Sequence, residues 1–163
     1  MEQALSSSQF TKDFFKEFIA PKEQLVYIEG KATLTEAAQL MLKKHVGNVV
    51  VVEERDGKKV PLGIITDRDI TIETIAQNVD PESLYVKDIM TSSLATAVQN
   101  EDIFSMIAKM KENGVHRLPV VDETGELISI VTSKKLVQCL VQGLNDLSAL
   151  STQQHQREKE IRH

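Results

Sequence analysis

An internal repeat constrains this chain more than any other feature. The order strand, helix, strand, strand, helix occurs from about Gly30 to Ile75 and again from about Gln99 to Leu140. Thr66, at the end of the last strand of the first copy, aligns with Thr132 at an offset of 66 residues, whereas the first helices align at an offset of 69. The hairpin of the first copy is therefore three residues longer. Neither copy is long enough to bury its own hydrophobic face well, so we expect the two copies to pack on each other.

Local signals place the elements of the first copy. Thr33, with Glu36 three residues on, has the form of a capping box, which predicts a helix from about Thr33 to a stop at Gly47-Asn48. The β-branched run Val49–Val52 is too apolar for a surface strand and predicts a strand buried on both faces. A turn at 55–58, a second strand at 60–66 and a second helix at about 67–77 complete this copy. The second copy repeats these signals, with helices at 103–110 and 133–141, a helix stop at 113–114, and strands at 118–121 and 127–132.

Length and composition indicate a globular protein and exclude several classes. A chain of 163 residues with 41% hydrophobic and 26% charged residues suits one compact domain or two small, intimately packed halves. The formal net charge of −5, with no basic stripe, argues against a nucleic-acid partner, because phosphate neutralisation needs clustered Lys and Arg. No apolar run is long enough for a membrane span and the N-terminus has no signal-peptide pattern, so we expect a cytoplasmic protein without a membrane partner. Cys139, the only cysteine, lies in an apolar helical run and is expected to be a buried structural thiol.

The two ends of the chain differ in character. Near the N-terminus, five apolar residues lie on one face of a predicted helix that Pro21 ends, namely Phe10, Phe14, Phe15, Phe18 and Ile19. Because such a patch is unusual on a monomer, either the body of the protein or a second copy should cover it. The tail from Ser151 has no apolar periodicity, and we expect it to be a frayed helix or disordered.

Two motifs that recur in both copies resemble those of a known family. The segments Gly63–Ile70 and Val115–Asp122 resemble the signatures of cystathionine-β-synthase (CBS) domains, and Val86–Thr91 resembles the usual lead into the second domain of a pair. The resemblance covers about Leu25 to Gln142, most of the chain. It implies a stand-alone tandem CBS pair, or Bateman module, with an α/β (α+β) fold of two βαββα units related by pseudo-twofold symmetry and two clefts between them. The expected segments are an N-terminal helix and linker (1–24), a first CBS domain (25–78), a linker (79–89), a second CBS domain (90–147) and a C-terminal tail (148–163).

The resemblance assigns a ligand role to the end of the first repeat. In this family the pattern Gly-apolar-apolar-Thr-x-x-Asp ends a strand and opens a helix at a nucleotide. It implies that the Asp69 carboxylate holds the ribose hydroxyls and that the Thr66 hydroxyl contacts ribose or phosphate, since one carboxylate can accept from two vicinal hydroxyls and a helix start offers free N–H groups. The residues implied to border the adenine are Ile64, Ile65, Ile28 and Val49. Without a ligand, the same pattern is that of a helix cap, in which Thr66 is the N-cap and Asp69 completes a capping box.

The second copy departs from this pattern. It keeps Thr132 but has Lys135 where the family pattern has aspartate, so we expect one good nucleoside site at the first motif and one degenerate site at Thr132 and Lys135. An ammonium in the first turn opposes the helix dipole by about 0.3–1 kcal/mol when exposed, so capping does not explain the lysine. A nearby polyphosphate would explain it, and so would plain solvent exposure, which the neighbouring Lys134 favours.

Basic residues supply the other expected contacts. In related proteins, residues at the positions of His116 and Arg117 point into the cleft and meet phosphates, whereas their counterparts in the first copy are Gly47 and Asn48. The second unit would thus supply charge to a nucleotide whose ribose the first unit holds, because a guanidinium binds phosphate oxygens in bidentate fashion. Alternatively, His116 is a core histidine bonded to the backbone, and Arg117 pairs with a carboxylate. Arg68 is either a further phosphate contact or a solvated side chain.

No pattern of catalytic or metal-binding residues accompanies these motifs. The histidines at 45, 116, 155 and 163 share no metal-ligand spacing with one another or with Cys139, and no glycine-rich phosphate loop is present. We therefore expect a regulatory module rather than an enzyme, with no required cofactor. Its expected ligands are AMP, ADP or ATP, and secondly S-adenosylmethionine or NAD. The expected partners are a second copy in a homodimer and an unidentified regulated protein. The alternative is a protein-interaction or oligomerisation module with a vestigial pocket, whose working surface is the phenylalanine-rich N-terminal helix.

Overall fold

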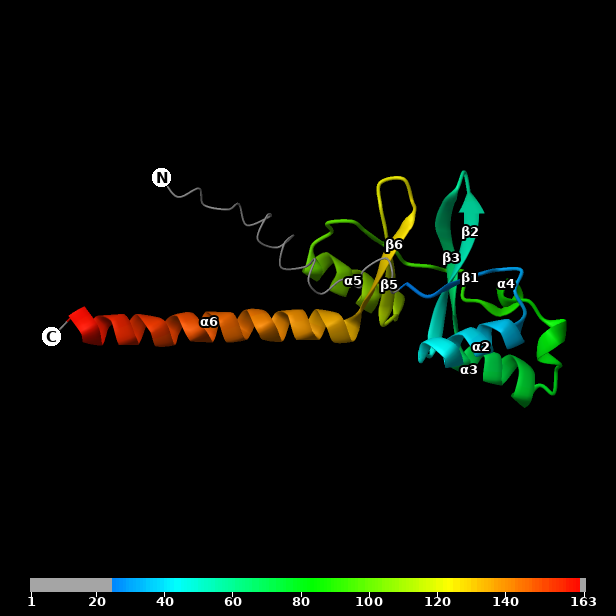
Figure 1. Cartoon of the computed structure of the whole chain (residues 1–163), viewed down its shortest axis with the longest axis horizontal. Coiled ribbons are helices and arrows are strands. Elements are labelled where there is room, and N and C mark those ends of the chain that lie inside the picture. Colours follow the sequence, from blue (N-terminus) through cyan, green and yellow to red (C-terminus); the bar gives the residue numbers. More distant parts are fainter. Residues whose placement is uncertain (1–24, 162–163) are drawn as a thin grey trace.

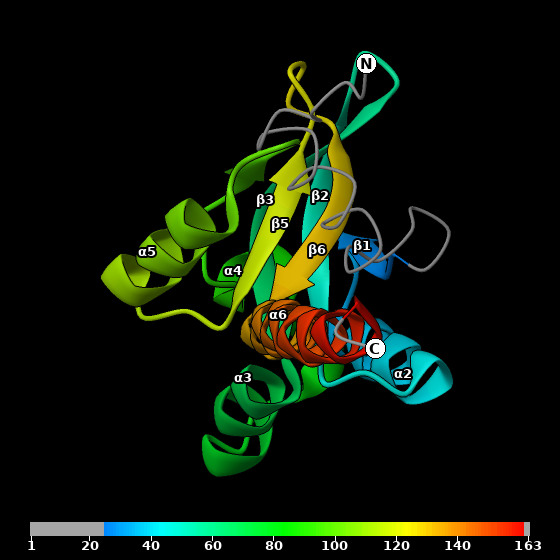
Figure 2. The ribbon, with the colours of Figure 1, turned by 90° about the vertical axis from the view of Figure 1, so that its left-hand side faces the viewer.

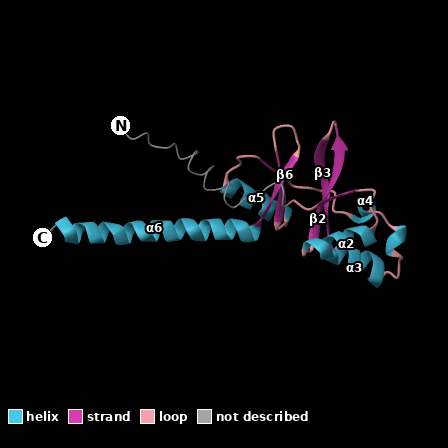
Figure 3. Cartoon of the chain, viewed as in Figure 1, coloured by secondary structure: helices cyan, strands magenta, loops and turns pink. Residues whose placement is uncertain are grey.

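The computed structural model describes the backbone of residues 25–161 and the side chains of residues 25–149. The first unit consists of β1 (Tyr27–Glu29), α2 (Leu34–Lys44), β2 (Asn48–Arg55), β3 (Lys58–Thr66) and α3 (Asp67–Thr71), which the π-helix η2 (Ile72–Ala76) prolongs. The second unit consists of β4 (Ala97–Val98), α5 (Ile103–Asn113), β5 (Arg117–Val121), β6 (Leu127–Thr132) and α6 (Ser133–Ile161). The predicted order of elements is therefore confirmed in both copies (Figure 3). The predicted N-terminal helix lies outside the described residues.

Each unit is built on a mixed three-stranded sheet. β1 pairs with β2 in parallel and β2 pairs with β3 antiparallel, and the strands β4, β5 and β6 repeat this arrangement. The register shifts once in each hairpin, between Val51 and Val52 and between Val120 and Val121. These shifts lie at equivalent positions of the two copies, so the duplication extends to the irregularities of the sheets.

Local hydrogen bonds set the helix boundaries. The predicted capping box is confirmed, because the Glu36 N–H donates to Thr33 Oγ1 at 3.2 Å and the Thr33 N–H donates to Glu36 Oε2 at 2.7 Å. α2 ends at His45, which has a left-handed backbone (φ 53°), so the predicted stop at Gly47-Asn48 is two residues too late. In α5, Gly114 adopts this conformation (φ 63°), as the sequence predicts. A glycine accepts that conformation without steric cost, which is why its signal is the clearer one.

Each unit has its own core, and a third cluster joins the units. The first core contains Leu34, Ala37, Met41, Val49, Val51, Ile65 and Val86, and the second contains Ala97, Ile103, Met106, Met110, Leu118, Val120, Val131, Leu136 and Cys139. The predicted strand with two buried faces is confirmed, because Val49 and Val51 face the first core while Val50 and Val52 pack with Leu127 of the second unit. Figure 2 shows β5 and β6 stacked in front of β2 and β3. Cys139 is buried as predicted, and burial raises the pKa of its thiol.

The segment between the units packs on the first one. It contains η3 (Pro81–Ser83) and α4 (Val86–Ile89), and the Val86 side chain is fully buried in the first core. The Val86 N–H donates to Ala32 O at 2.9 Å, and Thr91 pairs with Ile64 of β3. Much of the expected linker (79–89) therefore belongs structurally to the first unit.

The last helix is much longer than the predicted helix at 133–141. α6 continues to Ile161, through most of the tail for which we expect fraying or disorder, and the expected domain boundary at residue 147 falls inside it. Figure 1 shows α6 projecting away from both sheets, in the direction opposite to α3. Among the residues that the structure describes, no helix is both long and apolar enough to cross a membrane.

Candidate functional site

Thr66 and Asp69 form a complete capping box at the start of α3. Asp69 Oδ2 accepts from the Thr66 N–H at 2.9 Å and from Thr66 Oγ1 at 2.7 Å, while the Asp69 N–H donates to Thr66 Oγ1 at 3.1 Å. The capping interpretation is thus confirmed. The capping box uses one oxygen of the Asp69 carboxylate, Oδ2. Within residues 25–149, no side chain or backbone group donates a hydrogen bond to the other oxygen, Oδ1. The cap therefore leaves Asp69 with an acceptor for a ligand.

The equivalent motif of the second unit has an incomplete cap. The Lys135 N–H donates to Thr132 Oγ1 at 3.2 Å, but no carboxylate returns to the Thr132 backbone. Lys134 and Lys135 are both exposed, in agreement with the solvent-exposure interpretation. A ribose would find no carboxylate at this position, which supports the expectation of a degenerate site.

One polar contact joins the two motifs across the units. Asn48 is the strand partner of Thr66, and Arg117 is the strand partner of Thr132. With the Asn48 amide turned so that its oxygen faces the guanidinium, this oxygen accepts from Arg117 Nε at 3.1 Å and Nη2 at 3.2 Å. The alternative in which Arg117 pairs with a carboxylate is wrong for the described part of the chain. The partner of this guanidinium among the described residues is thus a neutral amide, beside the first unit's motif.

His116 lies at the surface rather than in a core. Its side chain is exposed, and its Nδ1 lies 3.3 Å from Ser133 Oγ at the start of α6. The core-histidine alternative is therefore wrong. The backbone here repeats the first copy, since the Ser133 N–H donates to His116 O at 2.9 Å and the Asp67 N–H donates to Gly47 O at 3.1 Å. The predicted correspondence of the Gly47-Asn48 pair with His116-Arg117 is confirmed.

The four apolar residues expected at the adenine have different surroundings. Val49 and Ile65 are buried in the first core, with exposed fractions of 1% and 0%. Ile28 is partly buried against the same core. Ile64 is partly buried and is the strand partner of Val50, whose side chain faces the second unit. Because strand partners share one face of a sheet, Ile64 faces the second unit as well. Adenine contact remains a prediction for all four, and Ile64 is the best placed of them.

Arg68 is exposed at the start of α3. Its N–H donates to Asp67 Oδ1 at 2.8 Å, and its guanidinium has no partner among the described residues. This position is compatible with a phosphate contact and equally with a solvated side chain. Within the described residues, no three His, Cys, Asp or Glu side chains gather in an arrangement that would hold a metal ion.

Two equivalent cavities with walls of described residues lie between the helices, one in each unit. One of about 450 Å³ lies between α2 and α3, with Met41, Val46 and Ile70 in its wall. Another of about 490 Å³ lies between α5 and α6, and its wall contains the equivalent residues Met110, Val115 and Leu136. Sequence analysis missed this pair of cavities, because helix periodicity gives no measure of the space between two helices. Neither is lined by Thr66 or Asp69.

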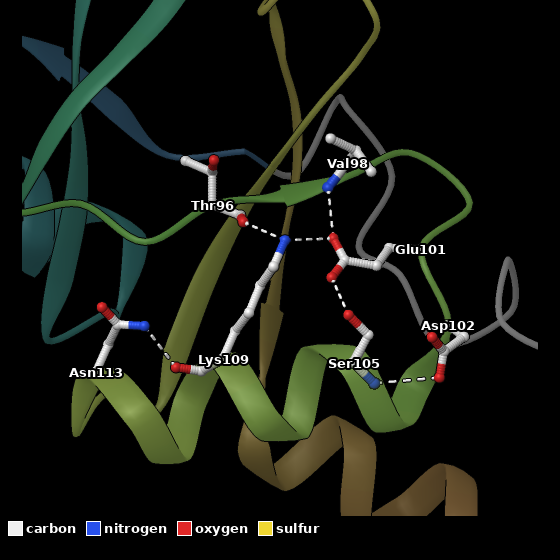
Figure 4. Close-up of polar contacts among 7 residues, drawn as sticks. All are labelled: Thr96, Val98, Glu101, Asp102, Ser105, Lys109 and Asn113. Carbon is white, nitrogen blue, oxygen red and sulfur yellow. Dashed lines mark hydrogen bonds and ion pairs between the residues drawn. The ribbon is translucent and has the colours of Figure 1, made fainter.

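A polar cluster in the second unit was also missed, and Figure 4 shows it. Lys109 Nζ donates to Glu101 Oε2 at 2.8 Å and to Thr96 O at 3.1 Å, while Ser105 Oγ donates to Glu101 Oε1 at 2.5 Å. Burial raises the pKa of Glu101, but the hydrogen bonds from Lys109, Ser105 and the Val98 N–H together outweigh it, so the net pKa is below its usual value. Every polar group in the cluster has a protein partner, which indicates a structural role.

Comparison with known proteins decides the family. The model of the CBS domain matches residues 15–73 and 86–142, which are most of the chain. The chain belongs to the CBS domain family. The CBS domain-containing protein YhcV of Bacillus subtilis is 32% identical over 133 residues, or 82% of this chain and 91% of YhcV. The uncharacterized protein MK0525 of Methanopyrus kandleri is 36% identical over 106 residues, or 65% of this chain and 53% of MK0525, so the chain spans about half of that relative.

A solved CBS pair confirms the architecture. The CBS domain pair of protein MJ0100, in complex with 5′-methylthioadenosine and S-adenosyl-L-methionine, superposes on this chain with a TM-score of 0.63 and 26% identity. The match covers 77% of this chain and 97% of the MJ0100 pair. The predicted tandem CBS pair is therefore confirmed, with two mixed three-stranded sheets as its framework.

Proposed function

We propose that this CBS pair is a non-catalytic regulatory module that binds an adenine nucleotide or an adenosyl ligand between its two units. The observation that supports this most is the contact between Asn48 and Arg117, which brings a cation of the second unit to the strand end that carries Thr66. A ligand bonded to both units would favour one relative orientation over another. Binding would then shift the population of orientations, and a regulated partner protein would respond to that shift.

The first unit would hold the ribose. Asp69 Oδ1 is available to accept from a ribose hydroxyl, whereas Oδ2 already accepts twice within the cap. The Thr66 hydroxyl donates its proton to Asp69, so toward a ligand it would act as an acceptor. Ile64, on the face toward the second unit, would contact the base. Because the cap fixes the Asp69 side chain before binding, little side-chain entropy would be lost on ribose binding.

The second unit would hold the phosphates or another polar group of the ligand. Arg117 has a neutral partner in Asn48, and a phosphate would offer its guanidinium stronger, charge-assisted hydrogen bonds. His116 is exposed beside it. AMP, ADP and ATP are the ligands that this arrangement favours. S-adenosylmethionine and NAD follow, and the MJ0100 pair, which is bound to two adenosyl compounds, supports the wider adenosyl class.

Thermal unfolding of the full chain with AMP, ADP, ATP, NAD or S-adenosylmethionine tests the proposal. A ligand of the native state at a hundredfold excess over its Kd stabilises by about 2.7 kcal/mol, or roughly 5 to 10 °C in Tm for a chain of this size. We expect at least one of the five to produce such a rise. In Asp69→Ala the rise should disappear, and Arg117→Ala should weaken the phosphorylated ligands more than S-adenosylmethionine.

Asp102→Ala is the matched control for the loss of the cap. Asp102 Oδ1 caps α5 by accepting from the Phe104 N–H at 2.9 Å and the Ser105 N–H at 3.1 Å. Asp102→Ala loses the N-cap of α5, which costs about 1 kcal/mol, and Asp69→Ala loses the carboxylate half of the capping box of α3, but only Asp69 lies at the proposed site. The Asp102 variant should keep the full ligand response. A parent that responds to none of the five ligands, or an Asp69→Ala variant that responds like the parent, would support the alternative of an oligomerisation module with a vestigial pocket.

A further inference from the structure

The internal repeat extends into the segment that precedes the first unit. Residues Phe14–Ile19 match Tyr85–Met90, at an offset of 71, in the chemical class of all six side chains. In both segments, FFKEFI and YVKDIM, an aromatic residue is followed by an apolar, a basic and an acidic residue and then by two further apolar residues. The two matches to the CBS domain begin at residues 15 and 86, at the same offset. The segment before the first unit is thus a counterpart of the segment before the second.

The later of these two segments completes the core of the first unit. It contains α4, and the side chain of Val86 is fully buried in that core. The backbone holds the segment as well, because the Val86 N–H donates to Ala32 O at 2.9 Å. The next N–H, that of Lys87, donates to Gly30 O at 3.0 Å. The first unit therefore takes part of its core from the segment that leads into the second unit.

The second unit has open acceptors at the equivalent positions. At the offset of 69 that relates the N-caps of α2 and α5, the two acceptors of the first unit correspond to Glu101 O and Gln99 O. Among residues 25–149, no backbone or side-chain group donates to either of these carbonyl oxygens. Within the same residues, the second core contains no counterpart of Val86. The place that α4 takes on the first unit is therefore available on the second.

The chain enters the described residues beside the second unit. Leu25 packs against the cluster that joins the two units and contains Leu127 of β6. Ile19 lies six residues before Leu25, and six residues span up to about 20 Å when extended. The segment that ends at Ile19 is therefore tethered within a short distance of the second unit of its own chain.

The second unit must hold its segment at a slightly greater distance. A Cβ built on Gly30 would lie 3.2 Å from Lys87 Cβ, so the first unit and the α4 segment touch there. Gln99 replaces this glycine in the second unit, and Ser129 replaces Gly63, another glycine that the chain approaches closely. The phenylalanines of the earlier segment suit this difference. They are larger than the valine and isoleucine of α4 to which they correspond, and so fill a wider gap.

We propose that residues 14–19 dock on the second unit of their own chain as α4 docks on the first. Phe15 enters the second core as Val86 enters the first, and the backbone of the segment donates to Gln99 O and Glu101 O. Each unit is then completed by the segment that leads into the other unit. The apolar face of the N-terminal segment is buried within the chain and does not serve as a working surface for a partner. This docking is independent of nucleotide binding.

A disulfide between two introduced cysteines tests the docking in the full chain without nucleotide. Position 16 corresponds to Lys87 and position 99 to Gly30, whose Cβ positions lie 3.2 Å apart, and a disulfide needs Cβ atoms about 3.5–4.5 Å apart. Lys16→Cys with Gln99→Cys should therefore form a link within one chain on mild oxidation. Non-reducing electrophoresis and mass spectrometry of an unreduced digest measure this link. The control, Lys16→Cys with Glu112→Cys, has its second cysteine at the other end of α5 and should form none. A test pair that forms no link, or a link that joins two chains, would overturn the proposal.

Two neighbouring phenylalanines test the burial. Phe15 corresponds to the fully buried Val86, so Phe15→Asp should lower the urea midpoint from far-UV circular dichroism by about 1 M or more. Phe14→Asp is the control, because Phe14 corresponds to Tyr85, whose side chain is 48% exposed. It should leave the midpoint nearly unchanged. Equal effects of the two substitutions, whether large or small, would contradict the docking, because only one of the two phenylalanines should enter the core. The disulfide pair leaves both phenylalanines in place and so does not depend on the stability of these variants.

Discussion

At the scale of single residues, Gly63 shows that the segment leading into the second unit shapes the first motif. A Cβ built on Gly63 would lie 2.5 Å from Thr91 O and 2.9 Å from Met90 Sδ. Thr91 cannot retreat easily, because its N–H donates to Ile64 O at 3.0 Å and its carbonyl accepts from the Ile64 N–H at 3.3 Å. The equivalent residue of the second copy is Ser129, which does have a Cβ. The glycine at the start of the first motif is therefore explained by close approach of the chain.

Gly63→Ala should destabilise the protein by about 1–3 kcal/mol or more, because the new methyl group must displace paired backbone. Urea unfolding followed by far-UV circular dichroism measures this cost. Gly143→Ala is the control, since a Cβ at that half-buried helical position would meet no atom within 4 Å other than its own helix backbone. It should stabilise by about 0.5–1 kcal/mol through its helix propensity. Equal effects of the two substitutions would show that the approach of Thr91 does not matter.

The sequence predicts the parts of the site formed by residues close together in the chain, but not the contacts between the two units. The Thr66–Asp69 cap depends on residues three positions apart, and the spacing alone indicated it. The equivalence of Asn48 with Arg117 followed from the alignment of the copies. Their contact did not, because it depends on how the two sheets stack, which no local pattern encodes. Strand alternation places Ile64 and Ile65 on opposite sides of β3, but the run of apolar residues could not show which of them faces the second unit.

At the scale of elements, the ion pair in Figure 4 fastens α5 to the strand before it. The Glu101 carboxylate accepts from the Val98 N–H of β4 at 3.0 Å and from Lys109 and Ser105 of α5. The Glu101 side chain is 9% exposed, so this pair is better shielded from solvent than an ordinary surface ion pair. The eight-residue separation of Glu101 and Lys109 gives no helical signal, which is why sequence analysis missed it.

The lowered pKa of Glu101 makes this attachment sensitive to acid. A carboxyl whose folded pKa lies below its unfolded value stabilises the fold fully above the unfolded value of about 4.5, and the contribution is lost as the pH falls through the folded pKa. We expect Glu101→Gln to reduce the free energy of unfolding near neutral pH and to flatten its decline below pH 4.5. Thermal unfolding from neutral to acidic pH measures both effects.

Glu112→Gln is the control for this prediction, since Glu112 is an exposed carboxylate on the same helix. It should leave the shape of the pH curve unchanged. If Glu101→Gln gave a curve parallel to that of the parent, the ion pair would not be the source of acid sensitivity in this region.

The sequence predicted helices and strands where a helix cap or a β-branched run marked them. Two helical elements lacked such signals and were not predicted. The tail of α6 contains good helix formers such as Gln, Glu, Lys and Arg but no apolar stripe, so a search for apolar periodicity does not find the helix. α4 has four residues, too few to show a period, although Val86 is fully buried in the first core. The spacing of apolar residues reveals neither the helix propensity of the α6 tail nor the burial of Val86 in α4.

At the scale of the whole molecule, the described contact between the units has an apolar and a polar part. Its apolar part is the cluster of Val50, Val52 and Leu127, and its polar part is the pair of Asn48 and Arg117. Each unit also has a core of its own. This arrangement would suit the proposed change of orientation, because the two units could move relative to each other without disrupting either core.

The same interface should still make the two units unfold together, since each alone is small and would expose one apolar face of its sheet. The chain allows a direct test, because its two tyrosines, Tyr27 and Tyr85, lie in or pack on the first unit and it has no tryptophan. Leu118→Ala removes a fully buried side chain from the core of the second unit and should cost about 2–5 kcal/mol. In urea, tyrosine fluorescence then reports unfolding of the first unit, while circular dichroism reports unfolding of both units.

If the two units unfold together, the urea midpoints from tyrosine fluorescence and from circular dichroism both decrease in Leu118→Ala. The control is Leu42→Ala, at a side chain that is 76% exposed, which should leave both midpoints nearly unchanged. A tyrosine midpoint that stays at the parental value in Leu118→Ala would show that the units unfold separately, and the proposed signalling would then have to depend on the ligand alone.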